Sequence, residues 1–184
     1  IRASDPSPER RALWTAIGVA TGEDNLAPAA CDVVVAAVKP QVFDAVLGAA
    51  ASALSERTLL VSIAAGIRTE RIARVTGARA RVVRVMPNTP LLVGAGAAGV
   101  AAGPRATRAD LDLVLAMFRG AGVAEEVDES LLDAVTAVSG SGPAYLFRFT
   151  ESLAKAAAAA GLAAELGAEL ARQTVVGSAK LLAE

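Results

Sequence analysis

The chain contains no histidine among its 184 residues and a single cysteine, Cys31. The absence of histidine excludes a Ser-His-Asp triad, a Cys-His pair and histidine ligation of a metal within this chain. One cysteine cannot form an intrachain disulfide, which favours a cytoplasmic location. Any chemistry must therefore use a cofactor, or lysine, carboxylate and hydroxyl groups, and we predict no metal site.

Aromatic residues are also scarce, at 3%, and the net charge is only −1. A core with so few rings must be built from small and aliphatic side chains. The balanced charge gives no electrostatic basis for binding nucleic acid. Charged residues such as Glu151 and Lys155 interrupt the apolar runs, and none reaches the roughly 20 residues of a membrane-spanning helix. We therefore expect neither a nucleic acid nor a membrane as partner, and no secretory signal is visible.

Strand-like and helix-like segments alternate over the first two thirds of the chain. Residues 33–38 include a continuous β-branched run, which predicts a strand buried on both faces of a parallel sheet. Residues 59–63 predict a second buried strand, and residues 81–86 a third strand. Residues 41–54 and 69–75 have helical spacing of apolar positions. This alternation predicts a doubly wound α/β layer.

In such a layer, ligands bind beyond the carboxyl ends of the strands. Residues 38–40, 64–66 and 87–90 follow the three predicted strands, so we expect these loops to form the site. Residues 94–99 also match the dinucleotide fingerprint G-x-G-x-x-G. We reject that match, because the fingerprint requires a strand before it and a helix opening within it, whereas Gly103-Pro104 shortly afterwards cannot continue a helix. A strand or loop of small residues is expected there.

Beyond Asp128 the pattern is helical only, which predicts an α/β domain over residues 1–127 and a helical domain over 128–184. The heptad 139–145 (Ser-Gly-Ser-Gly-Pro-Ala-Tyr) places Pro143 for the first position of a helix. Free N–H groups at such a helix start would bind a carboxylate or phosphate; the alternative is a simple linker between two helices. Apolar residues then recur about every four positions, as at Tyr145, Phe149 and Leu153. Two helices of this kind need a cover, either a partner subunit or their own α/β domain.

Three segments together resemble the pyrroline-5-carboxylate reductase family: residues 32–41 (DVVVAAVKPQ), 84–90 (RVMPNTP) and 133–145 (DAVTAVSGSGPAY). The resemblance covers essentially the whole chain. It implies a Rossmann-like dinucleotide-binding domain and a helical dimerisation domain that interlocks with another subunit in a homodimer or higher homo-oligomer. It further implies an enzyme that reduces the C=N bond of L-1-pyrroline-5-carboxylate to L-proline with NADPH or NADH, the last step of proline biosynthesis.

The resemblance also implies where the ligands bind. The cofactor site would comprise Ser4, Asp5, Asn25, Ala37, Val38, Lys39, Pro40, Ile63, Ala64 and Ala65. The substrate site would comprise Met86, Asn88 and Thr89, to which the anion-site argument adds Ser139, Gly140, Ser141, Gly142 and Pro143. The family's first strand and glycine-rich pyrophosphate loop are expected before Ile1, and its hydroxyl-bearing catalytic segment after Glu184. The catalytic residues are thus unknown, and we expect residues 1–184 alone to be inactive.

Several alternatives stay open at this point. Asp5 is either a partner of the adenine ribose or a helix cap, and Arg10 and Arg11 are near enough in sequence to meet a 2′-phosphate. Lys39 is either a general acid or Schiff-base lysine, or a cation that contacts the cofactor or caps the end of the strand, which we favour. The alternative functions are a related imine or hydroxyacid dehydrogenase, or a non-catalytic nucleotide-binding module that dimerises.

Overall fold

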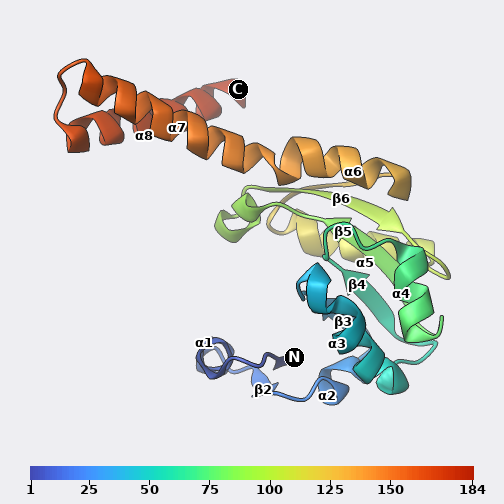
Figure 1. Cartoon of the computed structure of the whole chain (residues 1–184). Coiled ribbons are helices and arrows are strands. Elements are labelled where there is room, and N and C mark those ends of the chain that lie inside the picture. Colours follow the sequence, from blue (N-terminus) through green and yellow to red (C-terminus); the bar gives the residue numbers. More distant parts are fainter. The chain divides into compact units, whose positions relative to one another are not determined.

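The computed structural model describes all residues 1–184, which form two compact units, Ile1–Thr136 and Ala137–Glu184 (Figure 1). The strands of the first unit are β1 (Arg2–Ser4), β2 (Ala20–Gly22), β3 (Val33–Ala36), β4 (Leu59–Ser62), β5 (Arg81–Met86), β6 (Gly96–Ala102) and β7 (Gly122–Glu126). Its α-helices are α1 (Pro8–Ala16), α2 (Leu26–Ala29), α3 (Phe43–Ala50), α4 (Thr69–Thr76), α5 (Arg108–Arg119) and α6 (Leu132–Val135). Short 3-10 helices include η1 (Pro40–Val42), η2 (Ala51–Ala53), η3 (Thr89–Val93) and η4 (Glu129–Leu131).

Five strands form the main sheet in the order β3-β4-β5-β6-β7, and β1 and β2 form a separate parallel pair. All neighbours in the main sheet are parallel except β5 and β6. Only the 3-10 helix η3 connects β5 to β6, and such a short connection cannot provide the crossover that a parallel pair needs. The predicted α/β layer is confirmed, with one antiparallel pair in it.

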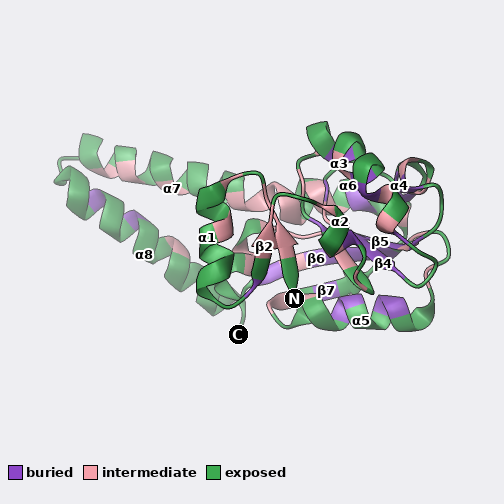
Figure 2. Ribbon diagram, turned by 90° about the horizontal axis from the view of Figure 1, so that it is seen from below, coloured by how far each residue is buried: buried purple, intermediate pink, exposed green.

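Both faces of the central strands are buried. Leu60 and Val82 face one apolar cluster with α3 and α4, including Phe43, whereas Val61 and Val83 face a second cluster with α5. Figure 2 shows the buried residues concentrated on β4, β5 and the inner side of α5. Burial of each such side chain stabilises the fold by about 1.5–3 kcal/mol.

The edge strand β3 differs from the prediction. It ends at Ala36, and its Val33 and Val35 side chains are 38% and 46% exposed. The reason is that α5, which covers this face of the sheet, packs against β5, β6 and β7 and does not extend to β3. The prediction that this strand is buried on both faces is therefore wrong.

Residues 96–102 form the strand β6, so the rejection of the G-x-G-x-x-G match is confirmed. A Cβ at Gly99 would lie 3.1 Å from the methyl carbons of Leu132 and Val135, so glycine lets α6 approach the strand closely. Leu132 is fully buried there. Because of this packing, η4 and α6 belong to the first unit, which ends at Thr136, although the helical pattern begins after Val127.

The second unit is a helical hairpin of α7 (Gly142–Ala159) and α8 (Ala164–Leu182). Gly161, with φ +101°, lies in the turn between them. The helices pack closely, since a Cβ at Gly167 would lie 3.0 Å from the Ala157 Cβ. Most other hairpin residues are exposed (Figure 2). Large apolar residues such as Tyr145 and Phe149 are among them. No helix of the chain has the length and apolar character needed to cross a membrane.

Candidate functional site

The carboxyl ends of β3, β4 and β5 lie next to one another. Ala36 pairs with Ser62, Ser62 pairs with Arg84, and the Ile63 N–H donates to the Ala36 carbonyl at 3.3 Å. All three strands are parallel, so the loops that follow them leave the sheet from one edge. These are the loops that the sequence singled out.

The first loop, residues 37–39, is extended and leads into η1 at Pro40. Val38 and Pro40 are half-buried, whereas Ala37 and Lys39 are exposed. The Lys39 ammonium forms no ion pair with any carboxylate of the chain. The loop therefore presents a small side chain and one unpaired cation to solvent.

The second loop, residues 63–68, connects β4 to α4. Ala64 is buried and its N–H donates to the Ser62 Oγ at 3.4 Å, while Ala65 is exposed and Ile63 is half-buried. Gly66 has φ +73°, and the space around its Cα is open. Small side chains along this turn leave room for a flat ligand close to the backbone.

The third loop, residues 87–90, follows β5. The Asn88 Oδ1 accepts the Ala97 N–H at 2.9 Å, which holds the loop against β6. Met86 and Asn88 are half-buried, and Thr89 is exposed at the start of η3. The loop is therefore anchored through the amide oxygen of Asn88.

At the end of β1, the Ser4 hydroxyl donates to the Asn25 Oδ1 at 2.6 Å, so two residues predicted near the adenosine lie in contact. Asp5 accepts the Ser7 N–H at 2.8 Å, and it is Ser7 that caps α1 by accepting the Arg10 N–H. The helix-cap interpretation of Asp5 is thus wrong, because Pro8 occupies the first helical turn and makes Ser7 the N-cap.

The two arginines of α1, Arg10 and Arg11, differ in their contacts and in their exposure. Arg11 donates to the carbonyls of Asp5 and Pro6 and pairs with Glu23 at 2.8 Å, so its guanidinium holds the turn together. The Arg10 side chain is 72% exposed and lies 3.7 Å from Asp5. Only Arg10 is therefore available to an anionic ligand at this turn.

Residues 136–140 form a π-helix, η5, followed by Ser141 and by α7 with Pro143 in its first turn. The heptad is thus mostly helical, with Ser141 between the two helices. The N–H groups of Ala144 and Tyr145 donate to the Ser141 carbonyl, so those two are not free for an anion. Single π-helical turns occur frequently at functional sites. From Ala137 onward this segment belongs to the second unit.

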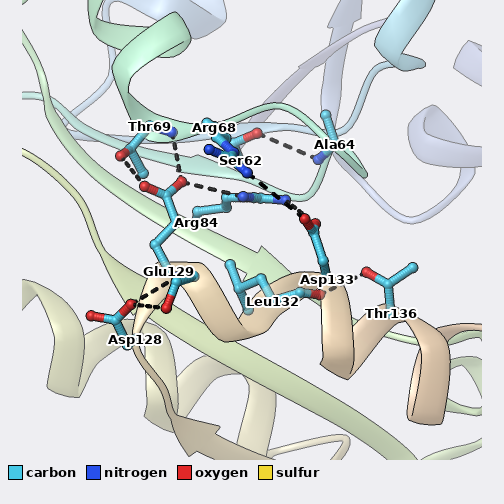
Figure 3. A network of polar contacts seen from close by, with 11 residues as sticks. Ser62, Ala64, Arg68, Thr69, Arg84, Asp128, Glu129, Leu132, Asp133 and Thr136 are labelled. Carbon is cyan, nitrogen blue, oxygen red and sulfur yellow. Dashed lines mark hydrogen bonds and ion pairs between the residues drawn. The ribbon is translucent and has the colours of Figure 1, made fainter.

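A buried arginine that the sequence reasoning missed lies beside the loops (Figure 3). Arg84 on β5 is only 2% exposed; its Nη1 lies 3.2 Å from the Glu129 Oε1 and its Nη2 lies 4.0 Å from the Asp133 Oδ1. Glu129 also accepts the Thr69 N–H at 2.7 Å and the Thr69 hydroxyl at 2.6 Å. Burial alone would raise the pKa of Glu129, but the hydrogen bonds from Thr69 and Arg84 outweigh it and lower that pKa. The available signal was an arginine within an apolar strand.

No group of three or more histidine, cysteine or carboxylate side chains in the structure could hold a metal ion. A mostly parallel sheet with three loops at its carboxyl edge, followed by a helical hairpin, is the arrangement of dinucleotide-dependent oxidoreductases with a helical second unit.

Comparisons with known proteins narrow the class. The family description "Pyrroline-5-carboxylate reductase dimerisation" matches residues 129–184, and "NADP oxidoreductase coenzyme F420-dependent" matches residues 1–66. The pyrroline-5-carboxylate reductase of Escherichia coli K12 is 40% identical over 181 residues, which cover 97% of this chain and 67% of that protein. The enzyme of the same name from Pseudomonas aeruginosa is 42% identical over 98% of this chain and 67% of its own length.

Solved structures of proteins with the same family name are also similar to this chain. A pyrroline-5-carboxylate reductase from Coxiella burnetii superposes with a TM-score of 0.88 at 37% identity, over 98% of this chain and 68% of that one. The Plasmodium falciparum pyrroline carboxylate reductase, solved with NADP bound, also gives 0.88, at 33% identity, over 100% of this chain and 68% of that one. The chain belongs to the pyrroline-5-carboxylate reductase family, as the sequence motifs predicted, and it spans about two thirds of the length of these relatives.

Proposed function

We propose that the protein reduces the C=N bond of L-1-pyrroline-5-carboxylate to L-proline by hydride transfer from NADPH or NADH, in proline biosynthesis. The observation that carries the proposal is the 40% identity to the Escherichia coli enzyme over 97% of this chain. The edge where the three loops meet is consistent with it, because dinucleotides bind at the carboxyl ends of the strands in such sheets.

The residues at this edge fit a dinucleotide. The exposed Ala37 and Ala65 and the open space at Gly66 would let a nicotinamide ring approach the backbone, with Ile63 and Ala64 forming the wall behind it. Val38, Lys39 and Pro40 would lie along the cofactor, and Ser4, Asp5 and Asn25 would meet the adenosine end. When bound, the reduced dinucleotide supplies the hydride.

The third loop is adjacent to the second, and we assign Met86, Asn88 and Thr89 to the substrate. Ser139, Gly140, Ser141, Gly142 and Pro143 would hold the substrate carboxylate through polar groups of the π-helical turn and the first turn of α7. A cyclic imine is readily protonated to an iminium, which accepts hydride without a histidine acid. The chain's task is therefore positioning, which can supply about 7–11 kcal/mol of the barrier in favourable cases.

The loop 139–143 can be tested by a side chain that blocks it. A Cβ at Gly142 meets nothing within 4 Å, so Gly142→Val should fold normally while crowding the proposed carboxylate site. We expect a KM for the imine raised at least tenfold, or loss of turnover, in steady-state assays of the full-length protein. Unchanged kinetics would remove this loop from the site.

The function itself is tested by mixing the full-length protein with NADPH or NADH and pyrroline-5-carboxylate, following nicotinamide absorbance and identifying L-proline by chromatography. Turnover of other cyclic imines or of hydroxyacids, but not of this substrate, would indicate a related dehydrogenase. Dinucleotide binding without turnover of any of them would indicate a non-catalytic module. We further propose that the protein forms a homodimer or higher homo-oligomer through the helical hairpin. We also propose that it is located in the cytoplasm.

A further inference from the structure

Strand β5 carries two arginines with matching surroundings. Arg81 donates through Nε to the Asp110 Oδ2 at 2.9 Å, and that oxygen also accepts the N–H and the hydroxyl of Thr107, the N-cap of α5. Arg84 pairs in the same way with Glu129, which accepts the N–H and the hydroxyl of Thr69. We call the first set (Arg81, Asp110, Thr107) the amino-end network and the second (Arg84, Glu129, Thr69) the carboxyl-end network.

The two networks differ in what they connect. Asp110 belongs to α5 and completes the capping box of that helix. Its partner Arg81 is the first residue of β5. Glu129 comes from η4 and caps α4, whose own N-cap residue, Arg68, makes no side-chain cap hydrogen bond. The start of α4 is thus held by a carboxylate from a distant segment.

The start of α4 is also the end of the second loop. Residues 63–68 are fixed at one end by β4, where Ser62 lies beside Arg84, and at the other end by Thr69 on Glu129. Figure 3 shows Ser62, Ala64, Arg68 and Thr69 gathered around the Arg84 guanidinium and the Glu129 carboxylate. Both anchors of the loop therefore meet the same ion pair, in which Arg84 is buried and Glu129 is half-buried.

We infer that Arg84 and Glu129 are positioning residues for the dinucleotide: they hold the loop 63–68 in the shape that receives the nicotinamide end, whereas the amino-end network only stabilises the fold. This inference rests on the proposed function, which assigns Ile63, Ala64 and Ala65 to the cofactor. Asp133 on α6 lies 4.0 Å from Arg84 and also 4.0 Å from Arg68. Arg84 therefore keeps Asp133 as a carboxylate neighbour when Glu129 is changed.

The test compares Glu129→Gln with the matched control Asp110→Asn in the full-length protein. Both changes remove one carboxylate that accepts from a threonine and an arginine; Asp110 is buried and Glu129 is half-buried. We expect Glu129→Gln to raise the KM and Kd for NADPH about 10- to 100-fold, as misplacement of a binding group does, with a smaller effect on KM for the imine. Amide hydrogen exchange over residues 63–69 should accelerate. Asp110→Asn should lower Tm without changing the KM or the Kd for NADPH.

Equal dinucleotide constants for the two variants, or unchanged exchange at 63–69 in Glu129→Gln, would overturn the inference. If Glu129→Gln does not fold, Thr69→Val and Thr107→Val provide a milder matched pair that removes only the hydroxyl from each network. Wild-type protein that binds NADPH but does not turn over pyrroline-5-carboxylate would refute the proposed function. The dinucleotide affinities and exchange rates of the variants would still decide whether the carboxyl-end network positions the loop.

Discussion

Arg10 is the residue on which the choice between the two dinucleotides should depend. Its side chain is 72% exposed beside Asp5, whereas the guanidinium of Arg11 is used by the turn and by Glu23. A 2′-phosphate is recognised by cations at this position of the fold. We expect Arg10→Ala to lower kcat/KM for NADPH about tenfold, equivalent to roughly 1.4 kcal/mol, and to leave that for NADH within about twofold. Steady-state assays with both dinucleotides measure it, and equal losses for both would contradict it.

Lys39 should contribute to binding and not to proton transfer. Its side chain is exposed on the first loop and has no carboxylate partner that would orient it toward a substrate. We expect Lys39→Met to weaken NADPH binding several-fold while single-turnover hydride transfer at saturating dinucleotide stays near the wild-type rate. A selective loss of the single-turnover rate would show that Lys39 acts in the chemical step.

Among the elements, η4 and α5 carry the two hydrogen-bonded carboxylates, Glu129 and Asp110, that should govern stability in acid. The pKa of Asp110, like that of Glu129, is lowered: burial alone would raise it, but hydrogen bonds from Thr107 and Arg81 outweigh burial. A carboxylate with a lowered folded-state pKa adds stability above its ordinary pKa, near 4, and loses it as the pH falls through the folded value. We expect the free energy of unfolding to fall below about pH 5, and the fall to be shallower in Glu129→Gln and Asp110→Asn.

Urea titrations at several pH values measure these slopes. The cation Arg84 faces both Glu129 and Asp133, so Asp133→Asn serves as the control for a neighbouring charge. A wild-type slope in both Glu129→Gln and Asp110→Asn would mean that neither carboxylate is linked to folding.

The close packing of α6 against β6 depends on Gly99. A Cβ there would lie 3.1 Å from Leu132 and Val135, closer than ordinary contact, so the helix would have to move. We expect Gly99→Val to lower the free energy of unfolding by about 1–3 kcal/mol. Gly48 within α3 is the control, because its Cβ would meet only Val75 at 4.0 Å, and Gly48→Ala should stabilise by about 0.5–1 kcal/mol. Urea unfolding of both variants decides, and a neutral Gly99→Val would show that the helix adapts.

Elements with a strong local pattern could be predicted from the sequence. The apolar runs at 59–63 and 81–86 are β4 and β5 to within a residue, and their order along the chain placed the three loops at one edge. The exposure of Val33 and Val35 could not be predicted, because it depends on how far α5 extends over the sheet. Nor could the carboxyl-end network, since Glu129 lies 45 residues from Arg84 and 60 from Thr69. Such contacts depend on tertiary packing and leave no periodic signal.

For the whole molecule, the two units differ in how far their apolar side chains are buried. The α/β unit covers both faces of its central strands with its own helices. The hairpin buries little beyond Gly167 and Ala171, and it leaves Tyr145, Phe149 and Leu170 at least half exposed. Apolar surface on this scale marks an association site, and the family description that matches residues 129–184 is a dimerisation domain.

The hairpin should therefore hold the oligomer together through its apolar side chains. We expect Leu170→Glu to convert the full-length protein to a monomer, because association would bury the new carboxylate without a partner. Gln173→Glu is the matched control, since it adds the same charge at an exposed polar position of α8 and should leave the oligomer intact. Sedimentation velocity with circular dichroism separates dissociation from unfolding. An oligomer of unchanged size in folded Leu170→Glu would place the subunit contact elsewhere, and dissociation by both variants would mean that added charge, and not lost apolar contact, drives the subunits apart.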